Sequence, residues 1–512
     1  MIFGSSNLII DSKYKKYEEI VNATSVKLSN DKEFARDFLL GHQFLMEEIR
    51  LGKPVYGVTT GYGSSGKNYL SFEDTQTLQK NLYRFHGCGV GENLSYEIAR
   101  YAVLIRLISL SKGHSGISFE LLERLELLLE KEIIPIIPSL GSVGASGDLT
   151  PLSYVAAVIA GEREVYYRGD ERNSIDVYRE LGIEPYVFKP KEALALMNGT
   201  AIMSAIALES LKKFEILLLS MESFVAGMYE VLLSDDTPLS EFVHDASKPF
   251  LGQIKVAKNI REKIEGSSLI HGRDDRYDKF FADNELNIQD TYSIRCAPQV
   301  LGVVRDNLEI SKSWVEQEIN SVNDNPLVDG KNRKLYTSGN FYGGYVAHAM
   351  DTLKISIANV ADLLDKEFAL LVDDKFNRGL GENLKIAKEN YYHGFKAMQI
   401  TLSSLSADII KNTTAASIHS RPTESLNQDK VSMGTTAALD FKKMNAVLED
   451  MLSIAFIGMA QAVEIRGKES VSTHLLNIHT AIRKEVAPLI EDRRMDLDIK
   501  KVKLMLNAGE FA

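Results

Sequence analysis

Three long stretches in the C-terminal part of the chain carry apolar residues at helical spacing and contain no proline. The longest, residues 200–234, runs for 35 residues with a single glycine. Its apolar positions recur every three or four residues, and others lie outside that stripe, which predicts a long helix buried on more than one side. Residues 341–372 and 431–468 also lack proline. Together the three stretches predict a bundle of long helices at the centre of the molecule.

The first 200 residues follow a different pattern. Glycine clusters interrupt shorter periodic segments there, in the strings GVTTGYGSSG, HGCGVG and GSVGASGDLTP. Residues 164–172, EVYYRGDER, predict a strand and a turn, and hence a small hairpin. We therefore expect a mainly α-helical protein with two domains. A smaller, loop-rich domain would occupy residues 1–200, and the long-helix bundle would occupy residues 201–512.

The composition is that of an ordinary globular protein and excludes several classes of partner. Hydrophobic residues make up 45% of the chain and charged residues 25%, which is enough apolar material for a large core. Lysine plus arginine total 59 and aspartate plus glutamate 70, so the net charge of −11 argues against nucleic acid as a partner. The most apolar long stretch, residues 216–233, carries Glu222 and Glu230. A bilayer centre disfavours such charges, so no membrane partner is expected.

Cysteine usage and the N-terminal residues favour a cytoplasmic protein. Cys88 and Cys296 are too few for a disulfide framework or for a zinc site made of four thiolates. The chain does not begin with a basic stretch followed by an apolar core, so no signal peptide is expected. His474 and His479 are five residues apart. That spacing does not place both on one helix face, and no metal site is expected.

Residues 61–67, GYGSSGK, fit the phosphate-loop pattern G-x-x-x-x-G-K. The next residue is Asn68, where magnesium coordination needs the hydroxyl of a serine or threonine. The residues that follow make a weak helix start, whereas a phosphate loop leads into a helix. A non-catalytic, nucleotide-binding helical protein is therefore a weak alternative.

The segment GSVGASGDLTPL, residues 141–152, carries the strongest candidate chemistry. Its simplest structural interpretation is a flexible loop before a helix, with Thr150 as N-cap and Pro151 at the first helical position. Small residues also let the backbone fold back tightly. The amide nitrogen of Gly147 could then attack the carbonyl carbon of Ala145, with loss of water. A second water, lost from the Ser146 side chain, would leave an exocyclic methylidene on a five-membered ring, which is a strong electrophile.

This segment resembles the signature of the histidine, phenylalanine and tyrosine ammonia-lyases, which build a 4-methylidene-imidazol-5-one (MIO) group from Ala-Ser-Gly. Six further segments resemble family motifs, and they occur in family order between about residues 55 and 434. They are VYGVTTGYG at 55–63, LALMNGT at 194–200, QDTYSIRCAPQ at 289–299, NDNP at 323–326, SGNF at 338–341 and NQDKVSM at 427–433. One short string is weak support, but seven in order are very specific.

The resemblance implies a carbon–nitrogen lyase that eliminates ammonia from an aromatic α-amino acid. It implies an MIO group made from Ala145, Ser146 and Gly147, no metal, and a homotetramer whose active sites draw on three subunits. Tyr56 would be the base that removes the β-proton, and Arg295 would bind the substrate carboxylate in a two-pronged ion pair. The remaining residues implied at the site are a catalytic tyrosine, Tyr292, and the substrate-binding Gly63, Phe85, His86, Asn198, Gln289, Phe341, Asn427 and Gln428.

Substrate choice is less clear from the sequence. Phe85 and His86 match the ring-recognition pair, which is usually Ser-His in histidine enzymes, Phe-Leu in phenylalanine enzymes and often His-Leu in tyrosine enzymes. Gln428 aligns where histidine enzymes carry glutamate, and an amide cannot supply the charge that pairs with an imidazole. We therefore expect conversion of L-tyrosine to 4-coumarate first, with histidine to urocanate as the alternative and phenylalanine next. An aminomutase would use the same residues, so the sequence does not separate it from a lyase.

Overall fold

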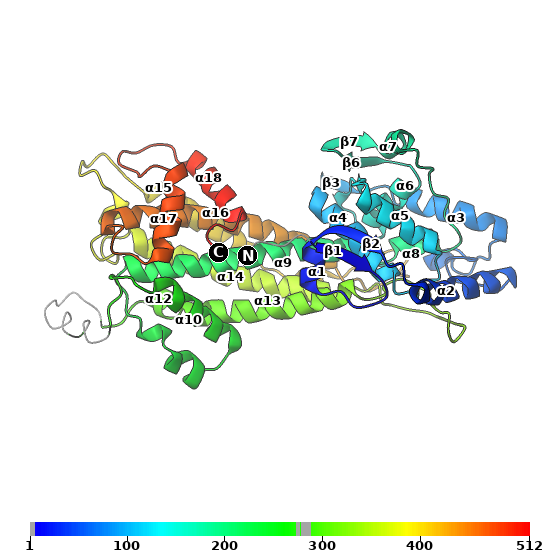
Figure 1. Ribbon diagram of the computed structural model, residues 1–512, viewed down its shortest axis with the longest axis horizontal. Coiled ribbons are helices and arrows are strands. Elements are labelled where there is room, and N and C mark those ends of the chain that lie inside the picture. The colour runs from blue at the N-terminus through cyan, green and yellow to red at the C-terminus, as the bar shows by residue number, and fades with distance from the viewer. Residues whose placement is uncertain (1–5, 273–276, 278–287) are drawn as a thin grey trace. The chain divides into compact units, whose positions relative to one another are not determined.

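The computed structural model describes residues 6–272, 277 and 288–512, and it is mainly helical, as the sequence predicts (Figure 1). The chain divides into two compact units. Unit 1 comprises Met1–Glu209, Ser311–Asp351 and Ala415–Leu439, and unit 2 comprises Ser210–Ile310, Thr352–Thr414 and Asp440–Ala512. The domain boundary expected near residue 200 stays a prediction, because the two units are defined by how compact they are and not as domains.

Unit 1 combines short helices with small sheets. The parallel pair β1–β2 and the antiparallel pairs β3–β5 and β8–β9 are two-stranded, and β4, β6 and β7 form a three-stranded sheet. The hairpin predicted at residues 164–172 is confirmed as β6–β7. The strands are β1 Ser6–Ile10, β2 Ala23–Leu28, β3 Val90–Asn93, β4 Ile134–Pro135, β5 Pro138–Leu140, β6 Glu164–Tyr167, β7 Asp170–Asn173, β8 Leu327–Asp329 and β9 Lys334–Tyr336.

Three of the helices that lie wholly in unit 1, α2, α3 and α4, begin with a side chain that caps them. Ser71 accepts a hydrogen bond from the Asp74 amide at the start of α3, and Ser95 accepts one from Ile98 at the start of α4. The helices are α1 Tyr17–Val21, α2 Lys32–Arg50, α3 Phe72–Phe85, α4 Tyr96–Leu110, α5 Phe119–Glu130, α6 Leu149–Ile159, α7 Ser174–Leu181 and α8 Glu192–Met197.

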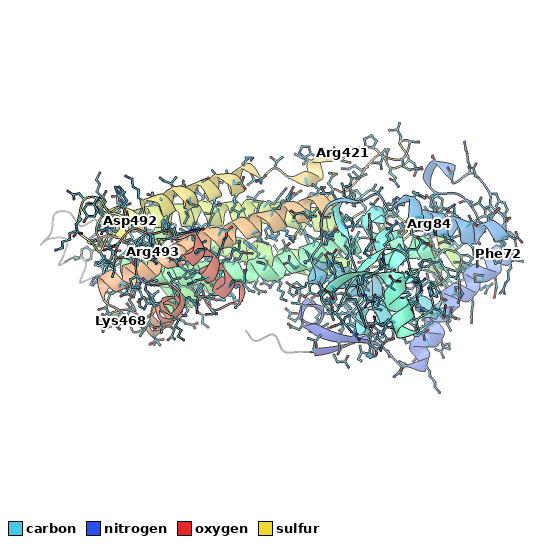
Figure 2. The ribbon with its side chains drawn as sticks, turned by 90° about the horizontal axis from the view of Figure 1, so that it is seen from above. Phe72, Arg84, Arg421, Lys468, Asp492 and Arg493 are labelled. Carbon is cyan, nitrogen blue, oxygen red and sulfur yellow. The ribbon has the colours of Figure 1, made fainter. Side chains whose placement is uncertain are left out.

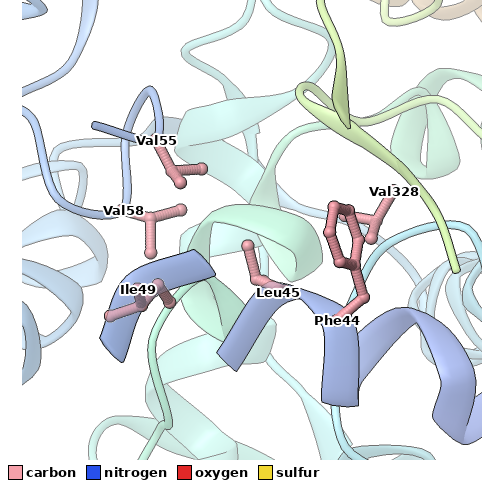
Figure 3. Close-up of a cluster of buried hydrophobic side chains, with 6 residues drawn as sticks. All are labelled: Phe44, Leu45, Ile49, Val55, Val58 and Val328. Atoms are coloured by element: carbon pink, nitrogen blue, oxygen red, sulfur yellow. The ribbon is translucent and has the colours of Figure 1, made fainter. Parts of the chain in front are cut away.

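A small hydrophobic cluster in unit 1 fixes the loop that carries Tyr56. Side chains from one face of α2 pack against valines on either side of that tyrosine (Figure 3). The cluster consists of Phe44, Leu45, Ile49, Val55, Val58 and Val328. Val55 and Val58 are buried, so removing them from water anchors residues 55–58 while Tyr56 between them stays accessible.

The three long helices predicted from sequence are confirmed. The structure has α9 at Ala201–Val231, α14 at Gly344–Val372 and α16 at Gly434–Arg466, and α13 at Ala297–Ile319 is a fourth. Each of these helices has residues in both units. The remaining helices of the described chain are short: α10 Leu251–Ile264, α12 Tyr292–Arg295, α15 Lys396–Lys411, α17 Thr473–Glu485 and α18 Asp496–Asn507.

Helix α16 explains the apolar run noted in the sequence. It is long and apolar enough to cross a membrane, but 83% of its most apolar window is buried inside the structure. Within unit 2, Phe456 of this helix packs edge to face on Phe224 of α9, with ring centroids 5.9 Å apart. The apolar side chains therefore have protein partners, as in the core helix of a globular protein. Lys468 follows this helix and lies at the same end of unit 2 as Asp492 and Arg493 (Figure 2).

Candidate active site

A pocket of about 880 Å³ in unit 1 gathers most of the residues predicted from sequence. Its walls come from the loop after α2, the end of α3, the segment before α6, the end of α8, the β9–α14 connection and the loop before α16. The predicted residues that line it are Tyr56, Gly63, Phe85, His86, Ala145, Ser146, Asn198, Phe341, Asn427 and Gln428. Their roles stay predictions, but their spatial association within one unit is a finding.

The Ala-Ser-Gly segment is held in a turn that only glycine allows. Gly147 has φ of +68°, and a Cβ on it would lie 2.2 Å from the carbonyl oxygen of Gly199. The Asp148 amide donates to that same oxygen over 2.8 Å. Asp148 is fully buried, which raises its pKa, and it accepts hydrogen bonds from Ser142, Thr435 and the Met203 amide. The backbone at residues 144–148 is thus tightly constrained.

Asn198 is aimed at the same segment. Its Nδ2 donates to the Ser146 carbonyl over 2.8 Å, and its Oδ1 accepts from the Asn325 amide over 2.8 Å. The fully buried Arg106 donates to the carbonyls of Ala195 and Asn198 and so holds the end of α8. A tight turn without room for a side chain, together with a donor on the central carbonyl, fits a group made by cyclisation of Ala145, Ser146 and Gly147.

No arrangement in the described part of the chain suits a metal ion. Among residues 6–272, 277 and 288–512, no three histidine, cysteine, aspartate or glutamate side chains gather so that they could hold one.

Tyr56 lies in the pocket with its oxygen engaged by the backbone. The Gly63 amide donates to Tyr56 Oη over 2.7 Å, and the side chain is 39% exposed. A donated N–H stabilises negative charge on a phenol oxygen, which is what a base needs. Tyr62, in the same pocket, is different, because burial raises its pKa far above the usual value. Of these two tyrosines, Tyr56 is the more exposed to the pocket and to solvent.

The structure adds Glu424, which the sequence did not suggest. Its carboxylate accepts from the Ser64 amide at 3.1 Å and the Ser64 hydroxyl at 3.0 Å. Glu424, Ser425 and Leu426 all have positive φ, in a turn closed by hydrogen bonds between Thr423 and Gln428. Non-glycine residues adopt this conformation rarely. No local sequence signal announces such a turn, so contact between residues 64 and 424 was not predictable.

We expect Glu424→Gln to lower kcat/KM about tenfold while the protein stays folded. The neutral amide accepts from Ser64 less strongly than a carboxylate does, and a loss of about 1.4 kcal/mol corresponds to a tenfold effect. The glycine loop that positions the Gly63 amide on Tyr56 would then be held less firmly. Steady-state kinetics with circular dichroism as the folding control measure this. Ser64→Ala should show a similar loss, and the double variant should add little; additive losses would contradict the shared contact.

Gln428 reaches the segment that the resemblance assigns to the electrophile. Its Nε2 donates to Ser146 Oγ over 2.9 Å, and its Oε1 accepts from Thr423 over 2.7 Å. Thr423 therefore orients the side-chain amide of Gln428, and the nitrogen of that amide donates to Ser146. This contact joins residues that are 282 positions apart in the chain.

The predicted ring-recognition pair lies at the end of α3. Phe85 is 60% exposed, whereas His86 is partly buried, and the two rings lie 4.5 Å apart. Burial lowers the pKa of His86 to about 4, and the positive charge of Arg163 acts in the same direction, so the imidazole is neutral near pH 7. Arg84 lies in the last turn of α3 (Figure 2). It pairs with Glu162 over 2.6 Å.

Thr150 does not cap α6, contrary to the expectation from sequence. The helix begins at Leu149, with Asp148 at the N-cap position, and Thr150 lies inside the first turn. Asp148 itself makes no side-chain cap there, because its carboxylate is used by Ser142, Thr435 and Met203. Thr150 Oγ1 instead lies 3.2 Å from His86 Nδ1.

We expect His86 and His474 to contribute less to the stability of the fold as the pH falls from about 6.5 toward 4. The folded state holds His86 and His474 with pKa values lowered to about 4, while in the unfolded chain both bind protons near pH 6.5. Because each of these histidines then binds its proton more tightly in the unfolded state, acid favours unfolding by up to about 3 kcal/mol per residue before solvent screening. Glu318 acts in the opposite direction, because burial raises its pKa to about 7 and the folded state keeps its proton. Urea unfolding measured between pH 4 and 7 checks this. Relative to the wild type, His86→Gln should be destabilised less by acid over this pH range. An equal pH dependence of the unfolding free energy in both proteins would count against the buried neutral ring.

Three predicted residues lie elsewhere. Gln289, Tyr292 and Arg295 belong to unit 2 and do not line the pocket of unit 1. Gln289 and Arg295 line a separate cavity of about 350 Å³, next to Asp290. The Arg295 guanidinium lies over the ring of Tyr292, 4.6 Å from its centroid. The Nε of Arg295 is buried and has no hydrogen-bond partner among the described residues, and a carboxylate ligand would satisfy it.

The structure contradicts the phosphate-loop alternative. Residues Gly63–Ser65 form a single 3-10 turn, and the next helix begins only at Phe72. The amides that would bind phosphate are already used, since Gly63 donates to Tyr56 and Ser64 donates to Glu424. A carboxylate at this position repels phosphate.

The helical fold and this site define a carbon–nitrogen lyase of the kind implied by the sequence motifs. The chain belongs to the aromatic amino acid lyase family, whose sequence profile matches residues 13–484. The family resemblance drawn from seven motifs is therefore confirmed.

Several proteins are similar over most of the chain. A histidine ammonia-lyase from a Geobacillus species is 37% identical, covering 89% of this chain and 87% of its own. The crystal structure of tyrosine aminomutase from Streptomyces globisporus has a TM-score of 0.94 at 31% identity, covering 99% of this chain and 98% of its own. That of histidine ammonia-lyase from Trypanosoma cruzi has a TM-score of 0.87 at 27% identity, covering 99% and 94%.

Proposed function

We propose that this protein eliminates ammonia from L-histidine to give urocanate. The observation that carries the proposal is His86, a neutral imidazole in the wall of the pocket that also contains Ala145 and Ser146. A neutral imidazole can exchange a hydrogen bond with the imidazole ring of a substrate. Several relatives of similar length are named histidine ammonia-lyase, which supports histidine over the tyrosine favoured by sequence reasoning.

L-Tyrosine is the second candidate, and Gln428 is the residue that favours it. Gln428 is neutral and is engaged with Ser146 and Thr423, so it does not offer an imidazole a charged partner. A phenol needs no such charge, and Phe85 adds apolar surface for an aromatic ring. The carboxylates of Glu424 and Asp429 line the same pocket, however, and they offer an imidazole the charge that Gln428 lacks.

The proposed chemistry divides among residues of this chain. Tyr56 would take the β-proton, with the Gly63 amide stabilising the charge left on its oxygen. Asn198 would hold the carbonyl of Ser146. Once formed from Ala145, Ser146 and Gly147, the MIO group would supply an electrophile that makes the substrate amine a better leaving group. The buried, unpartnered Nε of Arg295 suits a substrate carboxylate.

We also propose a homotetramer with shared active sites. The support is that Gln289, Tyr292 and Arg295 belong to unit 2, whereas the pocket with the Ala-Ser-Gly segment is built wholly from unit 1. Sedimentation velocity of the whole chain tests the assembly state. A monomer with full activity would refute sharing.

The function is tested by offering L-histidine, L-tyrosine and L-phenylalanine separately and following the ultraviolet absorbance of the conjugated acid. Turnover of histidine supports the proposal, and turnover of tyrosine alone would replace it with the second candidate. Intact mass gives an independent check, because cyclisation removes two waters from the chain. An unchanged mass in folded protein would refute an MIO enzyme, and a β-amino acid product would identify an aminomutase.

A further inference from the structure

His86 is held at two points by the first turns of α6. Its Nδ1 lies 3.2 Å from Thr150 Oγ1, and its backbone carbonyl lies 3.2 Å from Ser153 Oγ, whose proton it shares with the Thr150 carbonyl at 2.7 Å. Arg163 strengthens this attachment, because it donates to Ser153 Oγ over 3.0 Å and to the Tyr83 carbonyl over 2.6 Å. The end of α3 and the start of α6 are thus tied together around the imidazole, which fixes the ring with one nitrogen on Thr150.

The count of protons decides which nitrogen of His86 carries hydrogen. A neutral imidazole has one N–H, and a threonine hydroxyl has one proton to donate. Thr150 is buried, and within the part of the chain that the structure describes His86 Nδ1 is the only hydrogen-bond partner of its hydroxyl. If Nδ1 carried the proton, the buried hydroxyl would have no acceptor, which is unfavourable. The hydroxyl therefore donates to Nδ1, and the ring proton resides on Nε2.

We propose that Thr150 fixes His86 in the Nε2–H tautomer, so that His86 donates a hydrogen bond to an acceptor atom at the ring edge of the substrate. The proposal rests on the lyase function proposed above and deepens it by naming the substrate feature that is read. His86 lines the pocket, and with Nδ1 engaged its remaining ring nitrogen is Nε2. Thr150 acts through His86, so it is a positioning residue.

This arrangement selects a class of substrate. The unprotonated nitrogen of a neutral imidazole and the oxygen of a phenol both accept a hydrogen bond, whereas a phenyl ring has no acceptor at its edge. A phenyl substrate would leave Nε2–H without a partner, and an unpaired buried donor is penalised strongly in such sites. Rings with an edge acceptor are therefore preferred over a plain phenyl ring.

Two variants separate the hydroxyl from the packing, one nearly isosteric and one that removes only the methyl group. Thr150→Val keeps the branched shape and removes the hydroxyl, while Thr150→Ser keeps the hydroxyl. On whichever of histidine and tyrosine is turned over, we expect Thr150→Val to lower kcat/KM about tenfold, mainly through KM, and Thr150→Ser to stay within about twofold of the wild type. For L-phenylalanine, measured by KM or by its inhibition constant, Thr150→Val should change little. Equal losses on all three amino acids, or none, would overturn the proposal.

The tautomer is read directly in solid-state ¹⁵N spectra of the sedimented, histidine-labelled whole protein, with the His86 signals assigned by His86→Gln. Wild type and Thr150→Ser should show the protonated nitrogen at Nε2, and Thr150→Val should show a mixture. A wild-type proton on Nδ1 would overturn the proposal whatever the kinetics. Because this measurement needs no substrate, it still decides the tautomer if none of the three amino acids is turned over, which would instead refute the proposed function.

Discussion

Replacing Ser146 with alanine is expected to abolish turnover while the fold persists. In the proposed cyclisation the Ser146 side chain would supply the second water that is lost, and alanine has no hydroxyl to lose. The rate should fall by about a thousandfold or more, the size of effect seen when a covalent catalytic group is removed. Before cyclisation, alanine forfeits the hydrogen bond from Gln428, which is the contact that the described residues make to Ser146 Oγ, and its loss changes stability by about 1 kcal/mol.

Three measurements on Ser146→Ala check this. Product absorbance gives the rate, thermal unfolding followed by circular dichroism gives the stability, and intact mass gives the number of waters lost. The wild type should be two waters lighter than its sequence, and the variant should lack at least the second of these losses. Ser25→Ala, at an exposed serine on β2, is the matched control and should keep wild-type activity. Full activity in Ser146→Ala would refute the placement of the electrophile.

Tyr56→Phe should lower kcat by about 10²–10⁴-fold with little change in KM, because it removes the proposed base and keeps the ring. The phenylalanine side chain preserves packing beside Val55 and Val58, and the hydrogen bond lost is the one from the Gly63 amide. Intact mass should still show the loss of two waters, since cyclisation does not use Tyr56. Steady-state kinetics on the accepted substrate measure the effect.

Tyr62→Phe is the comparison variant for Tyr56→Phe. Tyr62 lines the same pocket, but burial raises its pKa far above the usual value, so it stays protonated and cannot serve as the base. We expect a much smaller loss, below about tenfold. Near-normal turnover in Tyr56→Phe, or an equal loss in both variants, would reject Tyr56 as the proton acceptor.

Helices of the bundle were predictable because their signals are local. A 3.6-residue apolar period without proline is a property of contiguous sequence, and residues 200–234, 341–372 and 431–468 became α9, α14 and α16 within a few residues. Most of the observed helix ends lie inside the predicted ranges, because capping and fraying depend on neighbouring residues in the fold. The hairpin at residues 164–172 was predictable for the same reason, since a turn and two short strands lie together in the chain.

The residues of the candidate site were predictable only where a few adjacent residues determine the possible reaction. Ala145, Ser146 and Gly147 carry their possible reaction in their own identities, and the glycine at 147 is required by a positive φ and by the Gly199 carbonyl behind it. Motif order along the chain then pointed to Tyr56, Asn198 and Gln428. Nothing in that order indicated that Gln428 donates to Ser146, because the contact depends on where two distant loops meet.

By itself the sequence determined the helical class and the family to which the chain belongs, and it singled out the Ala-Ser-Gly segment, because periodicity, motif order and residue identity all reside in the chain. Only the tertiary structure decided which groups form hydrogen bonds with one another. In the folded protein, amides of the phosphate-loop-like segment donate hydrogen bonds to Tyr56 and Glu424. Thr150, which was expected to cap a helix, is instead the hydrogen-bond partner of His86. The physical reason is that a hydrogen bond depends on distance and direction in space. Residues far apart in the chain acquire both only when packing brings their backbones together.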